Sequence, residues 1–267
     1  MRDPHVRELR YKIVPSELTE FVNPSPANWE WPECRVTAAN GIATIALLEH
    51  YPTVDEARRV VERYLRGWEI SSGLQSQSKR QPFHFEFRDH VLIDRNPDPE
   101  QELRITMQAR ASVTVSGVVS DTYRAYPVPL SEFDASPDVQ AMWWRWKEYK
   151  AGRESLPSMA YFCLTVLEAS MGEPRQGQRR RAAARYAVAI DVLNTLGHLV
   201  SEVGGQSERR KEHAKEKRAY SADERRWVEI VTLALIRRVG AVAHLAKPTT
   251  GQGVQLPAIT MADFPSV

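Results

Sequence analysis

The sequence predicts an α+β fold in two domains. The N-terminal domain, residues 1–129, should be a mixed, mainly antiparallel β domain; an all-α helical bundle follows over residues 134–247, and a tail over 248–267. Apolar residues alternate with polar ones in the first half, which is the two-residue period of half-buried strands, and recur at helical spacing in the second half. The period changes at a polar stretch that contains Pro127, Pro129 and Pro137.

Local signals place the elements of the N-terminal domain. The prolines of residues 1–33 predict an extended arm with one short strand at 11–14. Asn40-Gly41 separates two β-prone runs and predicts a type I′ hairpin, because both residues tolerate a positive φ. A capping box at Thr53 and Glu56 begins a helix expected over 54–70, followed by a Ser-, Gly- and Gln-rich loop at 71–78. Further strands are expected around 83–87 and over 103–116 and 118–124.

The second domain should consist of helices. Ser136 as N-cap, with Pro137 after it, begins a helix to Lys150, and others are expected over 155–170, 179–203 and 221–247. A polar, mixed-charge loop is expected at 207–218. The first of these helices carries three tryptophans that cannot all face one way, so at least one should lie at the seam with the N-terminal domain or another chain. A base-stacking platform is the alternative for these three residues, Trp143, Trp144 and Trp146.

Composition excludes several classes of function. No run approaches the ~20 apolar residues that span a bilayer, and residues 1–10 lack the apolar core of a signal peptide, so we expect a cytoplasmic protein without a membrane partner. Two cysteines are too few for a disulfide framework. His84 and His90 have no third ligand beside them in the sequence. No metal or other cofactor is therefore expected.

Charge is unevenly distributed. Residues 171–247 hold 16 Lys/Arg against 9 Asp/Glu, a net charge of +7, and the rest of the chain holds 20 against 25, a net charge of −5. This surplus favours an anionic partner, nucleic acid first, although a solvated helix face is the alternative. Positive charge in the first turns of the helix expected over 179–203 opposes its dipole, so a negative partner would stabilise it. The predicted nucleic-acid-binding residues there are Arg179, Arg180, Arg181 and Arg185.

The helix expected over 221–247 carries Arg237, Arg238 and His244. Arg237 and His244 lie about two turns apart and share one flanking face, whereas Arg238 projects into the apolar packing stripe. Histidine transfers protons near neutral pH and arginine binds phosphate, so such a pair can cleave RNA without a metal. The 2′-hydroxyl would attack, His244 would act as base or acid, and Arg237 or Arg238 would stabilise the charge on phosphorus. The alternative is that Arg237 and His244 face solvent and Arg238 only packs.

The segment from Arg237 to His244, RRVGAVAH, resembles the signature of the HEPN (higher eukaryote and prokaryote nucleotide-binding) superfamily of helical bundles, an Arg followed after roughly four to six residues by a His. The resemblance covers about residues 134–247. Only the Arg and the His of the family's signature have counterparts here, namely Arg237 or Arg238 and His244. The residue after the family's Arg is usually small and polar, and here Arg238 or Val239 departs from that pattern.

The resemblance implies a metal-independent endoribonuclease that forms its site across a homodimer. It further implies a bacterial antiphage-defence or toxin-type system, in which the N-terminal domain would be a sensor or regulatory module that binds a protein partner. The Arg/His pair of the enzyme would cleave an RNA target. The alternative is an inactive HEPN-like bundle that serves as a non-catalytic nucleic-acid-binding or protein-interaction adaptor.

Overall fold

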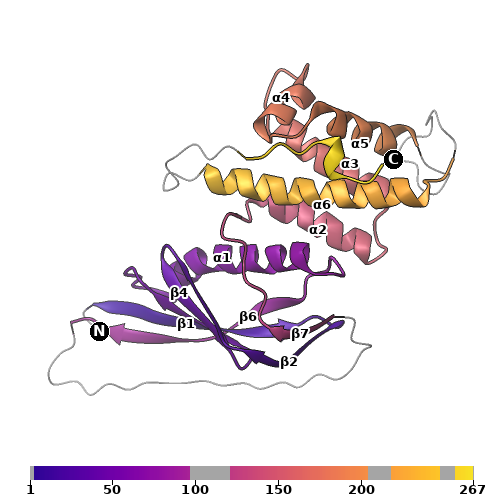
Figure 1. Cartoon of the computed structure of the whole chain (residues 1–267). Helices are drawn as coiled ribbons and strands as arrows, with labels where there is room; N and C mark the ends of the chain where they lie inside the picture. Colours follow the sequence, from indigo (N-terminus) through magenta and orange to yellow (C-terminus); the bar gives the residue numbers. More distant parts are fainter. Residues whose placement is uncertain (1–2, 97–120, 204–217, 247–255, 267) are drawn as a thin grey trace. The chain divides into compact units, whose positions relative to one another are not determined.

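The computed structural model describes residues 3–96, 121–203, 218–246 and 256–266 (Figure 1). The chain divides into two compact units, residues 1–131 and 132–267, and each is considered by itself. The first combines sheet and helix and the second is helical, so the fold is a mixed α+β fold. None of the helices in the described part of the chain has the length and apolar composition that crossing a bilayer requires.

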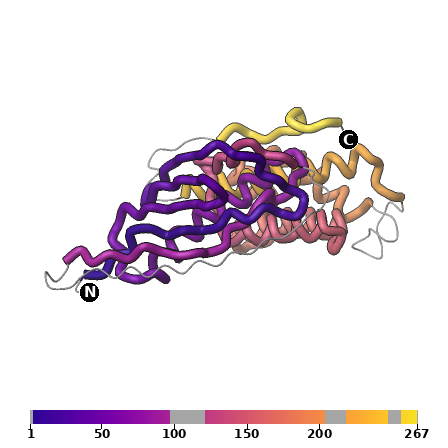
Figure 2. The backbone as a smooth tube through the Cα atoms, turned by 90° about the horizontal axis from the view of Figure 1, so that it is seen from below, coloured from indigo at the N-terminus to yellow at the C-terminus, as the bar shows by residue number. Residues whose placement is uncertain are grey.

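The first unit is built on a five-stranded antiparallel sheet with strand order β3-β4-β5-β1-β6. Its strands are β1 (Pro4–Pro15), β3 (Ala27–Trp31), β4 (Cys34–Ala39), β5 (Ile42–Leu47) and β6 (Phe83–Asp94), which run side by side in Figure 2. Helix α1 (Val54–Gln75) packs against this sheet. A separate parallel pair joins β2 (Thr19–Ser25) to β7 (Asp121–Ala125).

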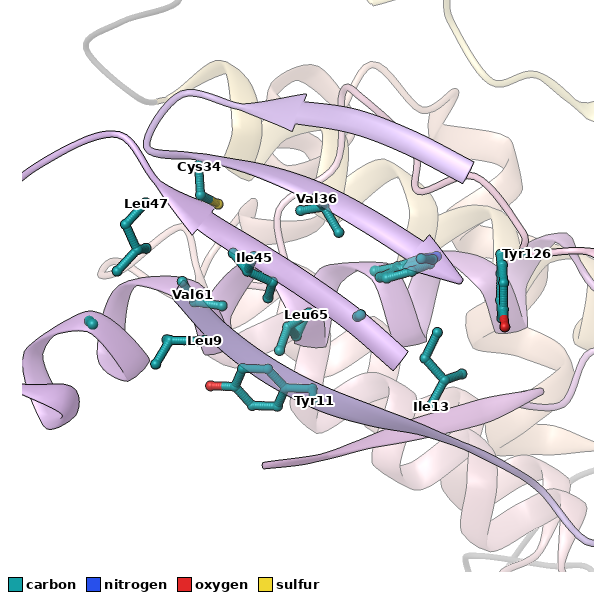
Figure 3. Close-up of a cluster of buried hydrophobic side chains, with 14 of the residues drawn as sticks. Leu9, Tyr11, Ile13, Cys34, Val36, Ile45, Leu47, Val61, Leu65 and Tyr126 are labelled. Carbon is teal, nitrogen blue, oxygen red and sulfur yellow. The ribbon is translucent and has the colours of Figure 1, made fainter. Parts of the chain in front are cut away.

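The core of this unit lies between the sheet and α1. Alternate residues of the strands, such as Leu9 and Ile45, point towards Val61 and Leu65 of the helix (Figure 3). All four are at most 3% exposed. Since burying one large aliphatic side chain contributes about 1.5–3 kcal/mol, this layer accounts for much of the unit's stability.

The prediction that residues 1–33 form an extended arm is wrong. β1 is an interior strand of 12 residues, paired on both sides with β5 and β6. Its prolines stand at its two ends, where a missing N–H is tolerated. A register shift between Val6 and Glu8 puts two residues, instead of one, between the buried Val6 and Leu9, and this bulge hides the two-residue period in the sequence.

The hairpin prediction is confirmed. Asn40 and Gly41 have φ values of 50° and 73°, and Ala39 of β4 pairs with Ile42 of β5. Gly41 N–H donates to the hydroxyl of Tyr126 over 2.8 Å, and its carbonyl accepts from the N–H of Ile13, also over 2.8 Å. The turn is therefore held by residues far away in the sequence.

Thr53 begins α1 as predicted, because its hydroxyl accepts from the N–H of Glu56 over 3.3 Å. The helix ends five residues later than the predicted 70, so the loop expected at 71–78 is wrong for residues 71–75. Ser71 lies inside this helix, and its hydroxyl donates to the backbone carbonyl of Trp68 over 3.2 Å. β6 is longer than the strand predicted around 83–87. The strand predicted over 103–116 lies outside the described residues, as does the start of that over 118–124.

The helices of the second unit are α2 (Pro137–Lys150), α3 (Leu156–Ala169), α4 (Gln178–Arg185), α5 (Ile190–Glu202) and α6 (Ala222–Leu245), with a short 3-10 helix at Met261–Asp263. α3 contacts each of the other four. The prediction of Ser136 as an N-cap is confirmed, and Ser155 and Ser221 cap α3 and α6 in the same way, since each hydroxyl accepts from the N–H three residues on. The loop predicted over 207–218 falls outside the described residues except for Arg218.

The single helix predicted over 179–203 is wrong, because the chain forms α4 and α5 with a break between them. Ala187 in the break has a φ of 47°. Val188 pairs with Ile259 of the C-terminal segment. The carbonyl of Ile259 accepts from the N–H of Ala189 over 2.7 Å, and the N–H of Ile259 donates to the carbonyl of Ala187 over 2.9 Å. A segment distant in the sequence, which forms an isolated β-bridge with Val188, thus supplies hydrogen bonds in place of those that a continuous helix would have made.

Candidate functional site

Helix α6 carries the predicted site residues, and its N-terminus is strongly defined. Ser221 and Glu224 form a reciprocal capping box, with 3.0 Å from Glu224 N–H to the Ser221 hydroxyl and 2.8 Å from Ser221 N–H to the Glu224 carboxylate. Arg218 donates two hydrogen bonds of 2.6 Å to the same carboxylate. These bonds lower the pKa of Glu224 to about 2, so the helix begins at a carboxylate that stays ionised.

Arg238 is buried, with only 8% of its surface exposed. Its Nη1 donates to the carbonyl of Tyr186 over 3.3 Å, and its Nη2 to the carbonyl of Pro257 over 2.6 Å. Burial lowers the pKa of Arg238, and the charge of Asp263 acts in the opposite direction. The guanidinium therefore joins α6 to the end of α4 and to the C-terminal segment, and two of its donors are occupied by backbone carbonyls.

Arg237 has a different environment. It is exposed, and no hydrogen bond or ion pair holds its side chain among the residues that the structure describes. His244 is half-buried and lies seven residues further along, on the same face of the helix. Sequence reasoning treated the two arginines as alternatives, and the structure leaves Arg237 as the one on the accessible face beside His244.

A third side chain, the ring of Phe133, lies on this face, where it packs over Gly240. Gly240 is three residues after Arg237 and four before His244, so it lies between them on the same side of α6. The ring of Phe133 covers it so closely that a Cβ on Gly240 would be 2.2 Å from Phe133 Cε2. The N–H of Asp134 also donates to the Gly240 carbonyl over 3.0 Å. The chain just before α2 is thus docked onto α6 at the glycine.

This geometry constrains what the face can bind. Arg237 and His244 are separated by about 10 Å along the helix axis, with the Phe133 ring between their positions. A phosphate that contacts both must lie above that ring, within reach of the long arginine side chain. Sequence reasoning missed Phe133 and Gly240. The available signal was the isolated glycine, which costs a helix interior about 1 kcal/mol relative to alanine and therefore indicates close packing.

The four arginines around α4 are not equivalent. Arg179 forms an ion pair of 2.6 Å with Glu168 and lies over Gly197. Arg181 donates to the carbonyls of Pro174 and Gln176. Arg185 is exposed but donates to the Ser170 carbonyl over 3.3 Å. Arg180 is exposed, and within the described segments its side chain makes no hydrogen bond or ion pair.

Arg185 lies near the end of α6, but at another face from Arg237. With Val242 and Leu245 of α6 it lines a pocket of about 570 Å³, whose other walls are formed by residues 184, 187 and 256–258. Val242 and Leu245 follow Arg238 by four and seven residues, so this pocket adjoins the buried arginine. The structure therefore brings Arg185 close to the Arg238 face and does not place it beside His244 on α6.

In the described part of the chain, neither the two cysteines nor His84 forms a second site. Cys34 and Cys163 are fully buried; burial raises the pKa of both thiols, that of Cys34 to about 12, which keeps the reactive thiolate unpopulated. His84 is exposed and lies 3.3 Å from Glu86. Within the described ranges, no group of three His, Cys, Asp or Glu side chains is placed to hold a metal ion.

Comparison with known proteins gives no match. No family model fits the chain, and no curated protein or solved structure is significantly similar to it. The likeness of the second unit to HEPN bundles therefore depends on the RRVGAVAH segment of α6 and stays a prediction.

Proposed function

We propose that this protein is a metal-independent endoribonuclease in which Arg237 binds the scissile phosphate and His244 transfers a proton. The observation that supports this most is the contrast on α6: Arg237 and His244 share an accessible face, whereas the guanidinium of Arg238 is buried against two carbonyls. We further propose that the enzyme serves a bacterial defence or toxin-type system in the cytoplasm, with the N-terminal unit as its sensor or regulatory module.

In the proposed reaction, the 2′-hydroxyl of RNA attacks the adjacent phosphorus and loses its proton to a general base. The bond from phosphorus to the 5′-oxygen breaks, and that oxygen takes a proton from a general acid. The products are a 2′,3′-cyclic phosphate and a 5′-hydroxyl. Arg237 would stabilise the charge that develops on the phosphate oxygens. One histidine cannot act as base and acid at once, so a homodimer that brings two α6 faces together would supply the second.

The test is cleavage of single-stranded RNA by the purified protein in EDTA. We expect 2′,3′-cyclic phosphate ends and no cleavage of DNA, which lacks the attacking hydroxyl. His244→Ala should abolish activity, and Arg237→Ala should lower turnover by roughly 10²–10³. Arg226→Ala is the matched control, since Arg226 is an exposed arginine on the same face of α6 but three turns from Arg237. It should leave turnover unchanged.

Cleavage that survives His244→Ala would contradict the proposal. Sedimentation of a clean monomer of 30.4 kDa at micromolar concentration would contradict the homodimer. The alternative function, a non-catalytic nucleic-acid-binding or protein-interaction adaptor, is favoured by one feature, the Phe133 ring between the two residues. It predicts a stable complex with another protein and no cleavage of any RNA, tRNA included.

A further inference from the structure

Trp144 on α2 is unusually exposed for a tryptophan. It presents 53% of its surface to solvent, whereas Trp143 and Trp146 on the same helix are 2% and 1% exposed. The buried side of α2 is formed by Val139, Met142, Trp143 and Trp146. Rotating α2 to bury Trp144 would expose one of the other two tryptophans. The packing of the helix therefore holds Trp144 at the surface.

Arg145 is held in place beside this indole. Its guanidinium carbon lies 4.7 Å from the centre of the Phe162 ring and 6.0 Å from that of Trp144. Its Nη1 is 3.0 Å from Glu154 Oε1, an ion pair, although neither oxygen of that carboxylate has a partner with hydrogen-bond geometry in the described part of the chain. The Glu154 side chain is 8% exposed and that of Arg145 is 32% exposed. A cation is thus fixed next to an exposed aromatic ring.

The stretch of chain that begins at Trp144 carries a net positive charge. Residues 144–154 contain four cationic side chains and two carboxylates, a net charge of +2. Both carboxylates are neutralised by arginines, Glu154 by Arg145 and Glu148 by two hydrogen bonds of 2.7 and 2.6 Å from Arg153. Lys147 follows Trp144 by three residues, on the same side of α2. Residues 144–154 therefore carry a net positive charge, and Arg145 lies 6.0 Å from the centre of the indole ring.

We infer that Trp144 is a stacking platform for a base of single-stranded nucleic acid, with Arg145 fixed beside the ring and Lys147 on the same side of α2 to contact a phosphate. Unpaired strands present flat base faces next to anionic phosphates, and exposed aromatic rings next to cations bind them. A protein interface buries about 800 Å² on each partner and needs more apolar surface than one indole. Among the described residues of this unit, Met261 is the other large apolar side chain that is exposed. The inference concerns binding and does not require the proposed cleavage.

The test is the binding of 5′-labelled (dT)12 and (U)12 by fluorescence anisotropy, with the full-length protein. The DNA strand has no 2′-hydroxyl, so its binding is measured without cleavage. Trp144→Ala should weaken binding of both strands roughly 5- to 150-fold, the range for loss of one stacked base. Trp144→Phe should keep most of the affinity, because it keeps a ring, and Met261→Ala should leave binding unchanged. Lys147→Ala should reduce the salt dependence by about 0.7 in log–log slope.

Three results would overturn the inference: wild-type protein that binds neither strand at micromolar concentration, Trp144→Ala that binds both as the wild type does, or Met261→Ala that loses as much affinity as Trp144→Ala. Failure of this inference is distinguishable from failure of the proposed function. RNA cleavage with (dT)12 binding insensitive to Trp144→Ala removes the stacking platform and leaves the ribonuclease. Binding that depends on Trp144, in a protein that does not cut RNA, leaves the platform and removes the ribonuclease.

Discussion

Arg237 and Arg238 are neighbours in the sequence but differ in every physical respect that decides their role. About 100° of helix rotation separates them, so one side chain reaches solvent and the other enters the packed interior. Arg238 donates to the carbonyl of Tyr186, which caps the C-terminus of α4 and has no helical partner there. Loss of Arg238 would leave that carbonyl and the carbonyl of Pro257 without their donors.

We therefore expect Arg238→Met to lower the free energy of unfolding by about 1–3 kcal/mol, because two poorly solvated acceptors lose their partner. Arg237→Ala should change it by no more than about 0.5 kcal/mol, as surface substitutions usually do. Urea unfolding of the two variants and the wild type measures the difference. Equal losses in both variants would show that Arg237 is also part of the packing, and would weaken its assignment to the site.

At the scale of elements, the start of α6 combines three stabilising features in one carboxylate. Glu224 completes the capping box with Ser221, accepts two hydrogen bonds from Arg218 and carries negative charge at the positive end of the helix dipole. The same helix positions Arg237 and His244 further along. The start of this helix therefore includes an ion pair that is lost when Glu224 is protonated in acid.

The pKa of Glu224, about 2 against an ordinary value of 4.5, predicts how the stability depends on pH. A carboxylate with a lowered pKa stabilises the fold above pH 4.5, and the contribution is lost as pH falls from there towards 2. Glu224→Gln keeps an acceptor for Ser221 but removes the charge. It should cost about 1–2 kcal/mol at pH 7, below the roughly 3 kcal/mol that the full shift implies, because Arg218 is half exposed and solvent screens the pair.

Chemical unfolding of the wild type and Glu224→Gln at several pH values tests this prediction. The difference between the two proteins should be constant above pH 5 and decrease towards pH 3. A difference that does not change with pH would show that the side chain acts by hydrogen bonding and packing alone. Ser221→Ala is the control, since it removes the cap without removing the titrating group.

At the scale of the whole molecule, the end of the chain belongs to the helical unit. The described residues 256–266 contact three places in it: Pro257 accepts from Arg238, Ile259 pairs beside Val188, and the ring of Phe264 lies 6.0 Å from that of Trp227. The region predicted as a tail after 247 thus supplies backbone groups that α4, α5 and α6 need.

The two units predict a pattern of limited proteolysis. Cleavage is expected in the proline-containing stretch near residues 125–137, because connections between domains are cut before packed elements are. It is also expected near 205–220 within the second unit, where the sequence predicts a polar, mixed-charge loop. Mass spectrometry of the protected fragments should find an end in one of these two ranges. A chain digested without any such fragment would unfold as one cooperative body, and the division at 129 and 134 would be wrong.

The sequence by itself determined the features that depend on neighbours along the chain. The Asn40-Gly41 turn, the serine N-caps of α2, α3 and α6 and the change from strands to helices are all local, because turn conformation, capping and periodicity involve residues a few positions apart. The presence of Arg237 and His244 on one helix face belongs to the same class.

Only the tertiary structure decided the rest. β1 is interior because β5 and β6 pair with it, and the break between α4 and α5 exists because Ile259 replaces the missing helical hydrogen bonds. Arg238 is buried because carbonyls at 186 and 257 accept from it, and Phe133 reaches Gly240 from a segment more than 100 residues earlier. Each depends on contacts between residues far apart in the sequence, and such contacts leave no periodic pattern in the sequence.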